Sequence, residues 1–325
     1  MDTHAHGVAM LPRPVALLRR VITPDLPSDL DLRVLTPSGP DVVVACAVGD
    51  DLVTRFWWPR DRWASVHRQL SDLAAATRNA DGVAPVRGRD DIGHNADAGQ
   101  RSVLLGVEGG DVVAEDPSRL HDLVALGVRV LGIVHFSDNA LGTMAMRWNG
   151  AEPARARGLG LTALGTEVVE RAAQLGVVVD VAHADITTTL DVCRVSSRPV
   201  LCSHTGARAL ADFARFVTDE QARAIAATGG LVGLWPFNDR KKGNGVPSID
   251  EFIRHVEHLT ALIGPDHLCL GTDQNGVPGF ADGYTGWGDW PVLLDALSRA
   301  GLDADRAAAV AGGNALRLFG EVLPG

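Results

Sequence analysis

Residues 162–183 have the sequence TALGTEVVERAAQLGVVVDVAH, and this stretch decides the fold. Thr162 is a typical N-cap, apolar residues follow it at helical spacing, and Gly176 is a typical helix stop, so the first part predicts a helix. The run at 177–181 is continuous and β-branched, which is typical of a parallel strand buried on both faces. The stretch therefore predicts one helix followed by one buried strand that ends in a histidine.

The same alternation of apolar runs and helical patterns recurs along the chain, and it favours a parallel sheet. With an N-terminal strand that ends at His6, eight strands are expected. Eight strand–helix units in a chain of this length predict an α/β fold, a (β/α)8 TIM barrel with loop insertions after the second strand (50–100) and before the fifth. A doubly wound open sheet is the alternative, but no GxGxxG follows a strand. The other predicted strands are 42–48, 102–107, 128–134, 199–202, 231–234 and 267–270, and the predicted helices are 162–175, 218–227 and 248–263.

The composition excludes several classes of protein. With 46% hydrophobic and 22% charged residues, the chain can bury a large core, which excludes intrinsic disorder. A net charge of −10 makes a poor nucleic-acid binder, since phosphate contacts need clustered Lys and Arg. No apolar run approaches the ~18 residues of a membrane span, and no signal-peptide pattern is present, so we expect a cytoplasmic protein without a membrane or nucleic-acid partner. The scattered cysteines are expected to be buried free thiols: Cys46, Cys193, Cys202 and Cys269.

Polar residues collect at the C-terminal ends of the predicted strands, where barrel enzymes build their active sites. His4 and His6 end the first strand at a spacing that points both side chains to one face, and two imidazoles there can hold a metal ion. Each histidine alone has a plainer explanation, as part of a flexible terminal pair or as a core side chain with a backbone partner. The joint arrangement is harder to explain in that way, because buried His and Glu without a ligand are costly. The further strand-end residues are Glu108, His135, His183, His204 and Asp273.

Glu108 is the predicted bridge between two metal ions. Many metal-dependent barrel hydrolases use a carbamylated lysine for this role, but the only lysines, Lys241 and Lys242, lie in a loop after the seventh strand. A carboxylate is therefore expected to bridge, and Glu108, between an apolar strand and a Gly-Gly turn, is the best placed. The expected ligands are His4 and His6 for one ion and His183 and His204 for the other.

Asp273 and His135 are the predicted catalytic residues. The carboxylate of Asp273 ends the eighth strand, where it can accept a proton from a metal-bound hydroxide and return it to a leaving nitrogen. His135 can stabilise a developing oxyanion. The plainer alternatives are an aspartate in an ordinary turn and a structural histidine bonded to Asp138 or Asn139. Structural or surface roles are expected for the histidines that follow no predicted strand: His94, His255 and His258.

Six short motifs occur in order between residues 106 and 277. They are 106–110 (GVEGG), 135–139 (HFSDN), 160–165 (GLTALG), 179–183 (VDVAH), 203–205 (SHT), and 271–273 (GTD) followed by 276–277 (GV). Together they resemble the membrane dipeptidase (renal dipeptidase) family of dinuclear zinc peptidases, within the amidohydrolase superfamily. The resemblance implies one amidohydrolase-type barrel domain over residues 1–325 with two zinc ions per chain, other divalent transition metals being an alternative. It also implies a metal-bridging hydroxide as nucleophile, Glu108 as the bridge, His135 on the substrate and its oxyanion, Asp273 as proton shuttle, and Arg215 on the substrate carboxylate.

Three departures from that family concern residues next to the expected site. His6 stands where the family usually has Asp, which replaces an anionic ligand with a neutral one and makes the site more electropositive. Phe216 follows Arg215 where Asn is common, and Gln274 and Asn275 replace an aromatic residue and Asp. The metal core is thus expected to be intact and the substrate shell altered.

We therefore expect a zinc-dependent dipeptidase that hydrolyses the amide bond of dipeptides, with a small dipeptide-like molecule as its substrate. Two alternatives stay open. One is an amidohydrolase of the same fold that acts on another amide, a lactam or an ester, for instance in secondary metabolism, and the altered substrate shell motivates it. The other is a non-catalytic metal-binding protein, against which the complete set of ligands argues. The sequence leaves the oligomeric state open, with a homodimer among the alternatives.

Overall fold

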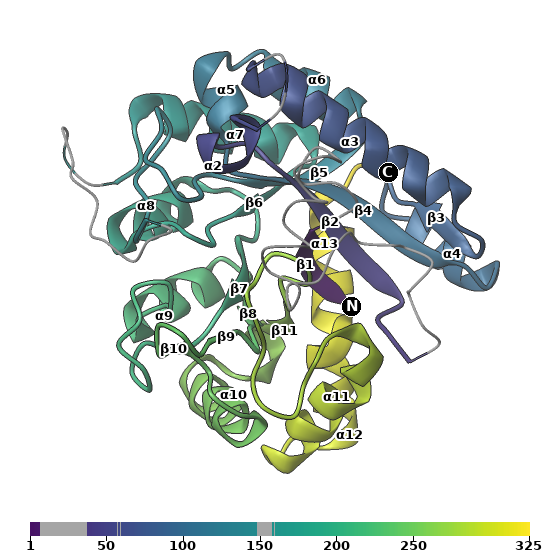
Figure 1. The fold of residues 1–325 in the computed structure, drawn as a ribbon, viewed down its shortest axis with the longest axis vertical. Coiled ribbons are helices and arrows are strands. Elements are labelled where there is room, and N and C mark those ends of the chain that lie inside the picture. Colours follow the sequence, from purple (N-terminus) through teal and green to yellow (C-terminus); the bar gives the residue numbers. More distant parts are fainter. Residues whose placement is uncertain (7–37, 57, 59, 148–157, 159) are drawn as a thin grey trace.

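Eight parallel strands close into a barrel with helices around it, which confirms the predicted fold class (Figure 1). The computed structural model describes residues 1–6, 38–56, 58, 60–147, 158 and 160–325, and the insertion expected before the fifth strand lies partly outside them. The barrel closes because the first strand pairs with the second on one side and with the last on the other. The barrel strands are β1 (Asp2–His6), β2 (Val42–Val48), β4 (Arg101–Glu108), β5 (Val128–Gly132), β6 (Val178–Asp180), β7 (Leu201–Thr205), β8 (Leu231–Leu234) and β11 (Leu268–Leu270).

The strands lie where the apolar runs predict them, with differences of a few residues at their ends. β5 ends at Gly132, two residues before the predicted end, and β7 continues to Thr205. β6 ends at Asp180. Val181 N still donates to Leu201 O, and beyond it the Asp180 carboxylate accepts hydrogen bonds from the backbone N–H groups of Ala182 and Ser203. These carboxyl ends form the mouth of the barrel.

The stretch after β2 carries an additional strand that the hydrophobic pattern did not reveal. β3 (Val83–Pro85) pairs with the start of β4. A two-stranded antiparallel sheet, β9 (Asn238–Asp239) and β10 (Asn244–Gly245), follows β8. These strands have only two or three residues, which is too short for a periodic signal.

Three helices, α7, α9 and α10, begin at side-chain caps that the sequence predicts. Thr162 Oγ1 accepts a hydrogen bond from Gly165 N at the start of α7, whose end is Gly176 with φ 69°. Thr218 forms a capping box with Gln221 at α9, and Ser248 caps α10. The described α-helices are α2 (Asp51–Thr54), α3 (Arg62–Asn79), α4 (Asp91–Asp97), α5 (Asp111–Glu115), α6 (Arg119–Ala125), α7 (Ala163–Leu175), α8 (Ile186–Val195), α9 (Asp219–Ala227), α10 (Ile249–Ile263), α11 (Trp290–Arg299), α12 (Ala304–Ala308) and α13 (Asn314–Val322).

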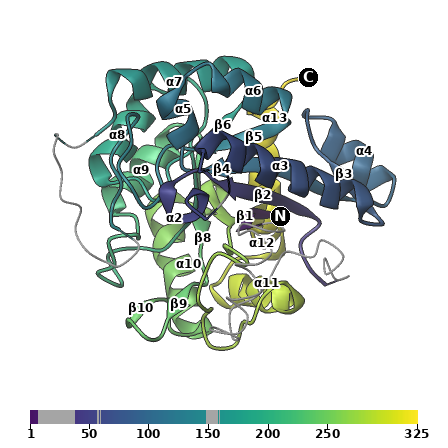
Figure 2. The same cartoon turned by 45° about the horizontal axis from the view of Figure 1, so that its top comes forward.

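The core has two parts, because successive strand residues face opposite sides of the barrel wall. In β2, Val43 packs in the cluster between strands and helices, whereas Val44 packs in the cluster inside the barrel. Leu318 and Phe319 of α13 close this inner cluster at the end opposite the mouth, and α13 is the yellow helix in Figure 2. Burial of each such side chain contributes about 1.5–3 kcal/mol, so the mouth can carry polar residues on a stable frame.

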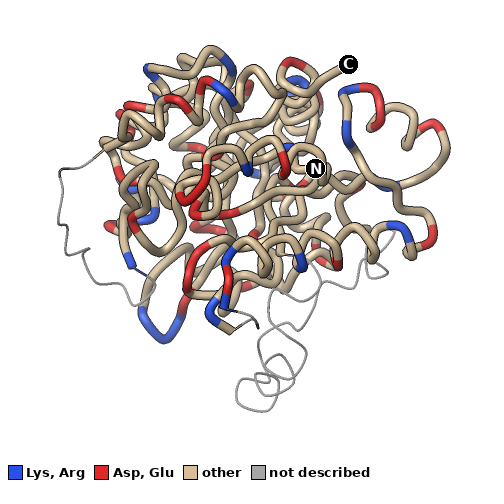
Figure 3. The backbone as a smooth tube through the Cα atoms, turned by 90° about the horizontal axis from the view of Figure 1, so that it is seen from above, with Lys and Arg blue, Asp and Glu red and all other residues tan. Residues whose placement is uncertain are grey.

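The four cysteines are free thiols, as predicted, and three of them are buried while Cys193 is partly exposed. No helix in the described part of the chain is long and apolar enough to cross a membrane. Lys and Arg are interspersed with Asp and Glu along the described chain (Figure 3).

Candidate metal centre and substrate pocket

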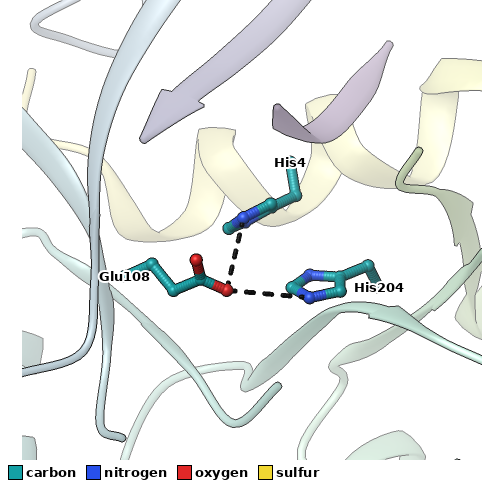
Figure 4. A group of neighbouring side chains, drawn as sticks. All are labelled: His4, Glu108 and His204. Carbon is teal, nitrogen blue, oxygen red and sulfur yellow. Dashed lines mark ion pairs between the residues drawn. The ribbon is translucent and has the colours of Figure 1, made fainter. Parts of the chain in front are cut away.

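The structure brings the predicted strand-end residues together at the mouth of the barrel, because parallel strands end at one edge. Glu108, at the end of β4, lies at their centre, and Figure 4 shows His4 of β1 and His204 of β7 pointing toward its carboxylate. All of the side chains that converge there are buried, with exposed fractions between 0% for His204 and 7% for Asp273. The residues that converge are His4, His6, Glu108, His135, His183, His204 and Asp273.

Both oxygens of the Glu108 carboxylate face imidazole nitrogens. Oε1 lies 2.9 Å from His183 Nε2, 3.5 Å from His4 Nε2 and 3.7 Å from His204 Nε2. Oε2 lies 3.2 Å from His6 Nε2, on the other side of the carboxylate. One carboxylate therefore contacts both predicted ligand pairs, as a bridging ligand must.

Asp273 joins the histidines of β1. Its Oδ1 lies 3.3 Å from His6 Nε2 and 4.0 Å from His4 Nε2. The sequence predicts a proton-transfer role for Asp273 and no metal-ligand role, whereas this geometry groups Asp273 with a predicted ligand pair, His4 and His6. We call His4, His6 and Asp273 the first half-site, and His183 and His204 the second half-site.

The two half-sites contain backbone conformations that only a tightly determined structure sustains. His183 has φ 68° and Asp273 has φ 54°, in the left-handed region that costs non-glycine residues free energy and that occurs often at functional sites. A Cβ at Gly276 would lie 2.0 Å from Asp273 Oδ1 and 2.4 Å from His6 Cδ2. Only glycine therefore fits beside the first half-site.

The donor set fits divalent metal ions. Among the described residues, buried His4 Nε2, both Glu108 oxygens and Asp273 Oδ1 have no aligned hydrogen bond, although they face one another at ion-pair distances. Such atoms are costly unless a ligand satisfies them. Potential ligand atoms lie within 4.8 Å of one another in three overlapping groups: His4, Glu108 and His204; His4, His6 and Asp273; and Glu108, His135 and His183.

The imidazoles of the two half-sites have opposite pKa shifts. Burial lowers the pKa of His6, but the two carboxylates that face it outweigh burial and raise the pKa to about 9. The pKa values of His183 and His204 lie well below the ordinary value, because burial and neighbouring positive charges, Arg215 among them, disfavour the imidazolium. The second half-site thus presents neutral imidazoles, whereas the first holds a proton that a metal must displace.

Three buried aspartates behind the site were not among the predicted residues. Asp50 Oδ2 lies 2.9 Å from His135 Nδ1, which leaves Nε2 of that imidazole toward Glu108, at 3.4 Å from Oε2. Asp2 and Asp180 accept hydrogen bonds around the first and second half-sites respectively. A signal was present, because Asp2 and Asp180 lie within buried strands, where a carboxylate is costly without donors.

Arg215 lies at the mouth with unused donors. It is 5% exposed, and its Nε and Nη2 have no hydrogen-bond partner among the described residues. Its guanidinium carbon lies 5.2 Å from the centre of the Trp235 ring, which in turn packs edge-on against His204 at 5.0 Å. A buried guanidinium beside the second half-site is suited to an anionic group.

The residues that depart from the family pattern have structural contacts. Asn275, with φ 68°, donates its side-chain N–H to His6 O, and the Gln274 carbonyl accepts from His6 N. Both therefore hold the end of β1. Phe216 is buried against Phe213 and His255.

The histidines expected to have other roles lie away from the site. His94 is exposed on α4. His255 is buried on α10 and accepts a hydrogen bond from Ala207 N, and His258 forms an ion pair with Asp219 at 2.9 Å. His255 thus anchors the loop that leads to Arg215.

Three curated relatives of this chain are dipeptidases by name. The sequence profile of the membrane dipeptidase family matches residues 23–323. An uncharacterized dipeptidase of Schizosaccharomyces pombe is 30% identical over 224 residues, which are 68% of this chain and 53% of that protein. Dipeptidase aclJ of Aspergillus oryzae is 28% identical over 261 residues, 79% of this chain and 59% of that protein. The chain thus spans little more than half the length of these relatives.

The solved structures agree on the architecture. A metallopeptidase of Rhodobacter sphaeroides, liganded with a phosphinate mimic of the dipeptide L-Ala-D-Ala, is similar with a TM-score of 0.82 and 21% identity, with 99% of each chain covered. This likeness supports the barrel fold, and the family profile covers nearly the whole chain. The chain therefore belongs to the membrane dipeptidase family.

Proposed function

We propose that this protein is a zinc-dependent dipeptidase in which two metal ions share Glu108. The observation that carries the proposal is the set of buried polar atoms around one carboxylate that lack aligned hydrogen bonds to any described residue. Folded proteins rarely leave such atoms unsatisfied, so the set points to ligands that complete it.

The residues of the two half-sites would hold the ions, His4, His6 and Asp273 the first and His183 and His204 the second. Mixed nitrogen and oxygen donors suit zinc, and other divalent transition metals fit the same set. Two such ions, when bound, would supply a water of lowered pKa as the nucleophile and would stabilise the negative charge that develops on the amide oxygen.

Asp273 and His135 handle the proton and the oxyanion. The Asp273 carboxylate faces a histidine of each half-site, 3.3 Å from His6 Nε2 through Oδ1 and 3.9 Å from His204 Nε2 through Oδ2. It accepts the proton of the attacking water and delivers it to the leaving amine nitrogen. Burial lowers the pKa of His135, but the facing carboxylates of Glu108 and Asp50 raise it above the ordinary value. The resulting imidazolium keeps its Nδ1 proton toward Asp50 and has a second N–H at Nε2 to donate to the amide oxygen.

Arg215 binds the free carboxylate of the substrate. A planar guanidinium can pair with a carboxylate through two hydrogen bonds, and its buried Nε and Nη2 lack partners among the described residues. A dipeptide offers that carboxylate next to the scissile amide, which favours dipeptides over amides without a nearby anion.

The test is a substrate screen on zinc-loaded protein with L,L- and L,D-dipeptides, their C-terminal amides and N-acyl amino acids. We expect hydrolysis of dipeptides with a free C-terminus and rates at least ~10-fold lower on the matched amides, the size of one charge-assisted pair. Equal rates on acid and amide would favour an amidohydrolase for another substrate. Full metal content without hydrolysis of any substrate would favour a non-catalytic protein.

A further inference from the structure

The buried carboxylate of Asp180 holds both ligands of the second half-site from behind. It is 3% exposed. Its Oδ1 accepts hydrogen bonds from Ala182 N at 2.9 Å and from Ser203 N at 3.0 Å. Ala182 directly precedes His183, and Ser203 directly precedes His204, so one carboxylate ties the ends of β6 and β7 together where the two ligands leave them.

The other oxygen of Asp180 determines the direction of a hydrogen-bond chain. The Ser203 hydroxyl donates to Asp180 Oδ2 at 2.6 Å, and Ser203 Oγ lies 2.8 Å from His204 Nδ1. A hydroxyl has one hydrogen, and a carboxylate can only accept. Ser203 Oγ must therefore accept from His204, which places the imidazole proton on Nδ1.

The consequence falls on the nitrogen that faces the site. With the proton on Nδ1, His204 Nε2 carries a lone pair, and it lies 3.7 Å from Glu108 Oε1 and 3.3 Å from His183 Nε2. A histidine binds a metal through a nitrogen without a proton, and the hydrogen bond at its other nitrogen selects that form.

We propose that Asp180 and Ser203 are positioning residues that fix His204 as the Nδ1–H tautomer and so prepare its Nε2 for a metal ion. The inference rests on the proposed metal site, but the tautomer of the metal-free protein can be measured without metal or substrate. It goes beyond a general packing role, because it predicts that reversing the direction of the hydrogen bonds lowers zinc affinity more than removing the Ser203 hydroxyl does.

The substitution Asp180→Asn reverses the direction of the hydrogen bonds from residue 180 through Ser203 to His204. The amide oxygen must take the place of Oδ1, since two backbone N–H groups point there, so the amide NH2 faces Ser203. Ser203 Oγ then accepts from Asn and donates to His204 Nδ1, which moves the imidazole proton to Nε2. Ser203→Ala only removes the constraint, and both tautomers remain accessible.

The primary measurement is the tautomer of His204 in metal-free protein, by long-range ¹H–¹⁵N correlation of the imidazoles, with the signal assigned by its loss in His204→Gln. We expect Nδ1–H in the wild type and Nε2–H in Asp180→Asn. An Nε2–H tautomer in the wild type would overturn the proposal, and this measurement needs no substitution at Asp180 or Ser203.

The second measurement is zinc affinity at the second half-site, by competition with a chelator. We expect Asp180→Asn to lower it by ~10–100-fold, the usual effect of losing a partner of a metal-bound histidine, and Ser203→Ala to lower it less. The double variant Asp180→Asn/Ser203→Ala should bind zinc more tightly than Asp180→Asn alone. A double variant that binds zinc no better than Asp180→Asn would contradict the hydrogen-bond chain from Asp180 through Ser203 to His204. If Asp180→Asn does not fold, the comparison of Ser203→Ala with Ser203→Thr replaces it, and only Ser203→Thr should retain the wild-type zinc affinity.

The first half-site offers a matched control. Asp2 Oδ1 accepts from Thr272 N at 2.9 Å, and Asp2 Oδ2 accepts from the Thr272 hydroxyl at 2.5 Å, but the next residue is Asp273, which has no tautomer. Asp2→Asn should lower the melting temperature and leave the His204 signal unchanged. If the His204 tautomer is as expected but no dipeptide is hydrolysed, the proposed function fails and the relay stands.

Discussion

The two half-sites are built on the same plan and differ at one step. In each, a buried aspartate accepts hydrogen bonds from the backbone N–H and the hydroxyl of the residue just before a site residue. Asp2 accepts from Thr272, before Asp273, and Asp180 accepts from Ser203, before His204. In the second half-site the Ser203 hydroxyl also contacts the ligand itself, His204 Nδ1, at 2.8 Å, and it lies 3.4 Å from His4 Nδ1 of the first half-site. In the first, Asp2 instead accepts a hydrogen bond from the indole of Trp287.

This difference suggests two ways to prepare a buried ligand set. The second half-site presents neutral imidazoles, because burial and positive neighbours lower the pKa values of His183 and His204. The Ser203 hydroxyl also fixes the proton of His204 on Nδ1. The first half-site balances charge, since the carboxylates facing His6 hold its pKa near 9. Glu108 is the residue that the two strategies share, so variants should separate it from residues of one half-site alone.

The largest effect is expected from Glu108→Ala. Removal of the shared carboxylate should release both ions and lower kcat/KM by on the order of 10³-fold or more, at least the cost of losing one oxyanion-stabilising group. Elemental analysis after dialysis provides the measurement, and His204→Ala is the control, because it should lose the second ion in preference to the first. A full complement of two metals in Glu108→Ala would refute the bridge.

A smaller loss is expected from Asp273→Asn. The amide keeps the shape of the carboxylate but cannot accept a proton, so turnover should fall by ~10²-fold or more. The second half-site should keep its ion, because Asp273 groups with His4 and His6. Turnover close to that of the wild type would show that another group carries the proton.

Arg215→Ala should lower kcat/KM on a dipeptide by about ten- to a hundred-fold, the value of one charge-assisted pair in a partly desolvated pocket. The variant should lose the preference of the wild type for a free acid over its C-terminal amide, while both metals remain bound. Steady-state kinetics on the acid and the amide decide this, and an unchanged preference would reject Arg215 as the carboxylate-binding residue.

The smallest expected effect is on the pH dependence of stability, and it concerns His255, which anchors the loop between His204 and Arg215. Burial lowers its pKa to about 4, against ~6.5 in an unfolded chain, so between these values the unfolded state binds a proton that the folded state does not. The stability of the wild type should therefore fall as pH falls from 6.5 toward 4, by on the order of 1–3 kcal/mol more than that of His255→Leu. Urea unfolding of both proteins across this range measures it, and parallel pH profiles would contradict it.

The sequence predicts the barrel, and which polar residues converge at its mouth, because their signal is local. Most barrel strands are buried apolar runs, and polar residues stand at or just after the ends of these runs, as with His183 after β6. β3 is missed because three residues carry no periodicity. The role of Asp2 is missed because its partner Thr272 is 270 positions away, and only barrel closure brings them together.

The grouping of Asp273 also required the structure. A strand-end carboxylate can serve as ligand, proton carrier or turn residue, and the sequence does not separate these roles. Its left-handed backbone and the absence of a Cβ at Gly276 turn the carboxylate toward His6. The sequence thus predicts which residues converge, and the loop conformations determine how they are shared between the half-sites.

The most direct test of the shared Glu108 is anomalous diffraction at the zinc edge from crystals of the zinc-loaded protein. We predict two peaks with Glu108 between them, one beside His4, His6 and Asp273 and the other beside His183 and His204. A single peak, or two peaks of which one does not contact Glu108, would contradict it.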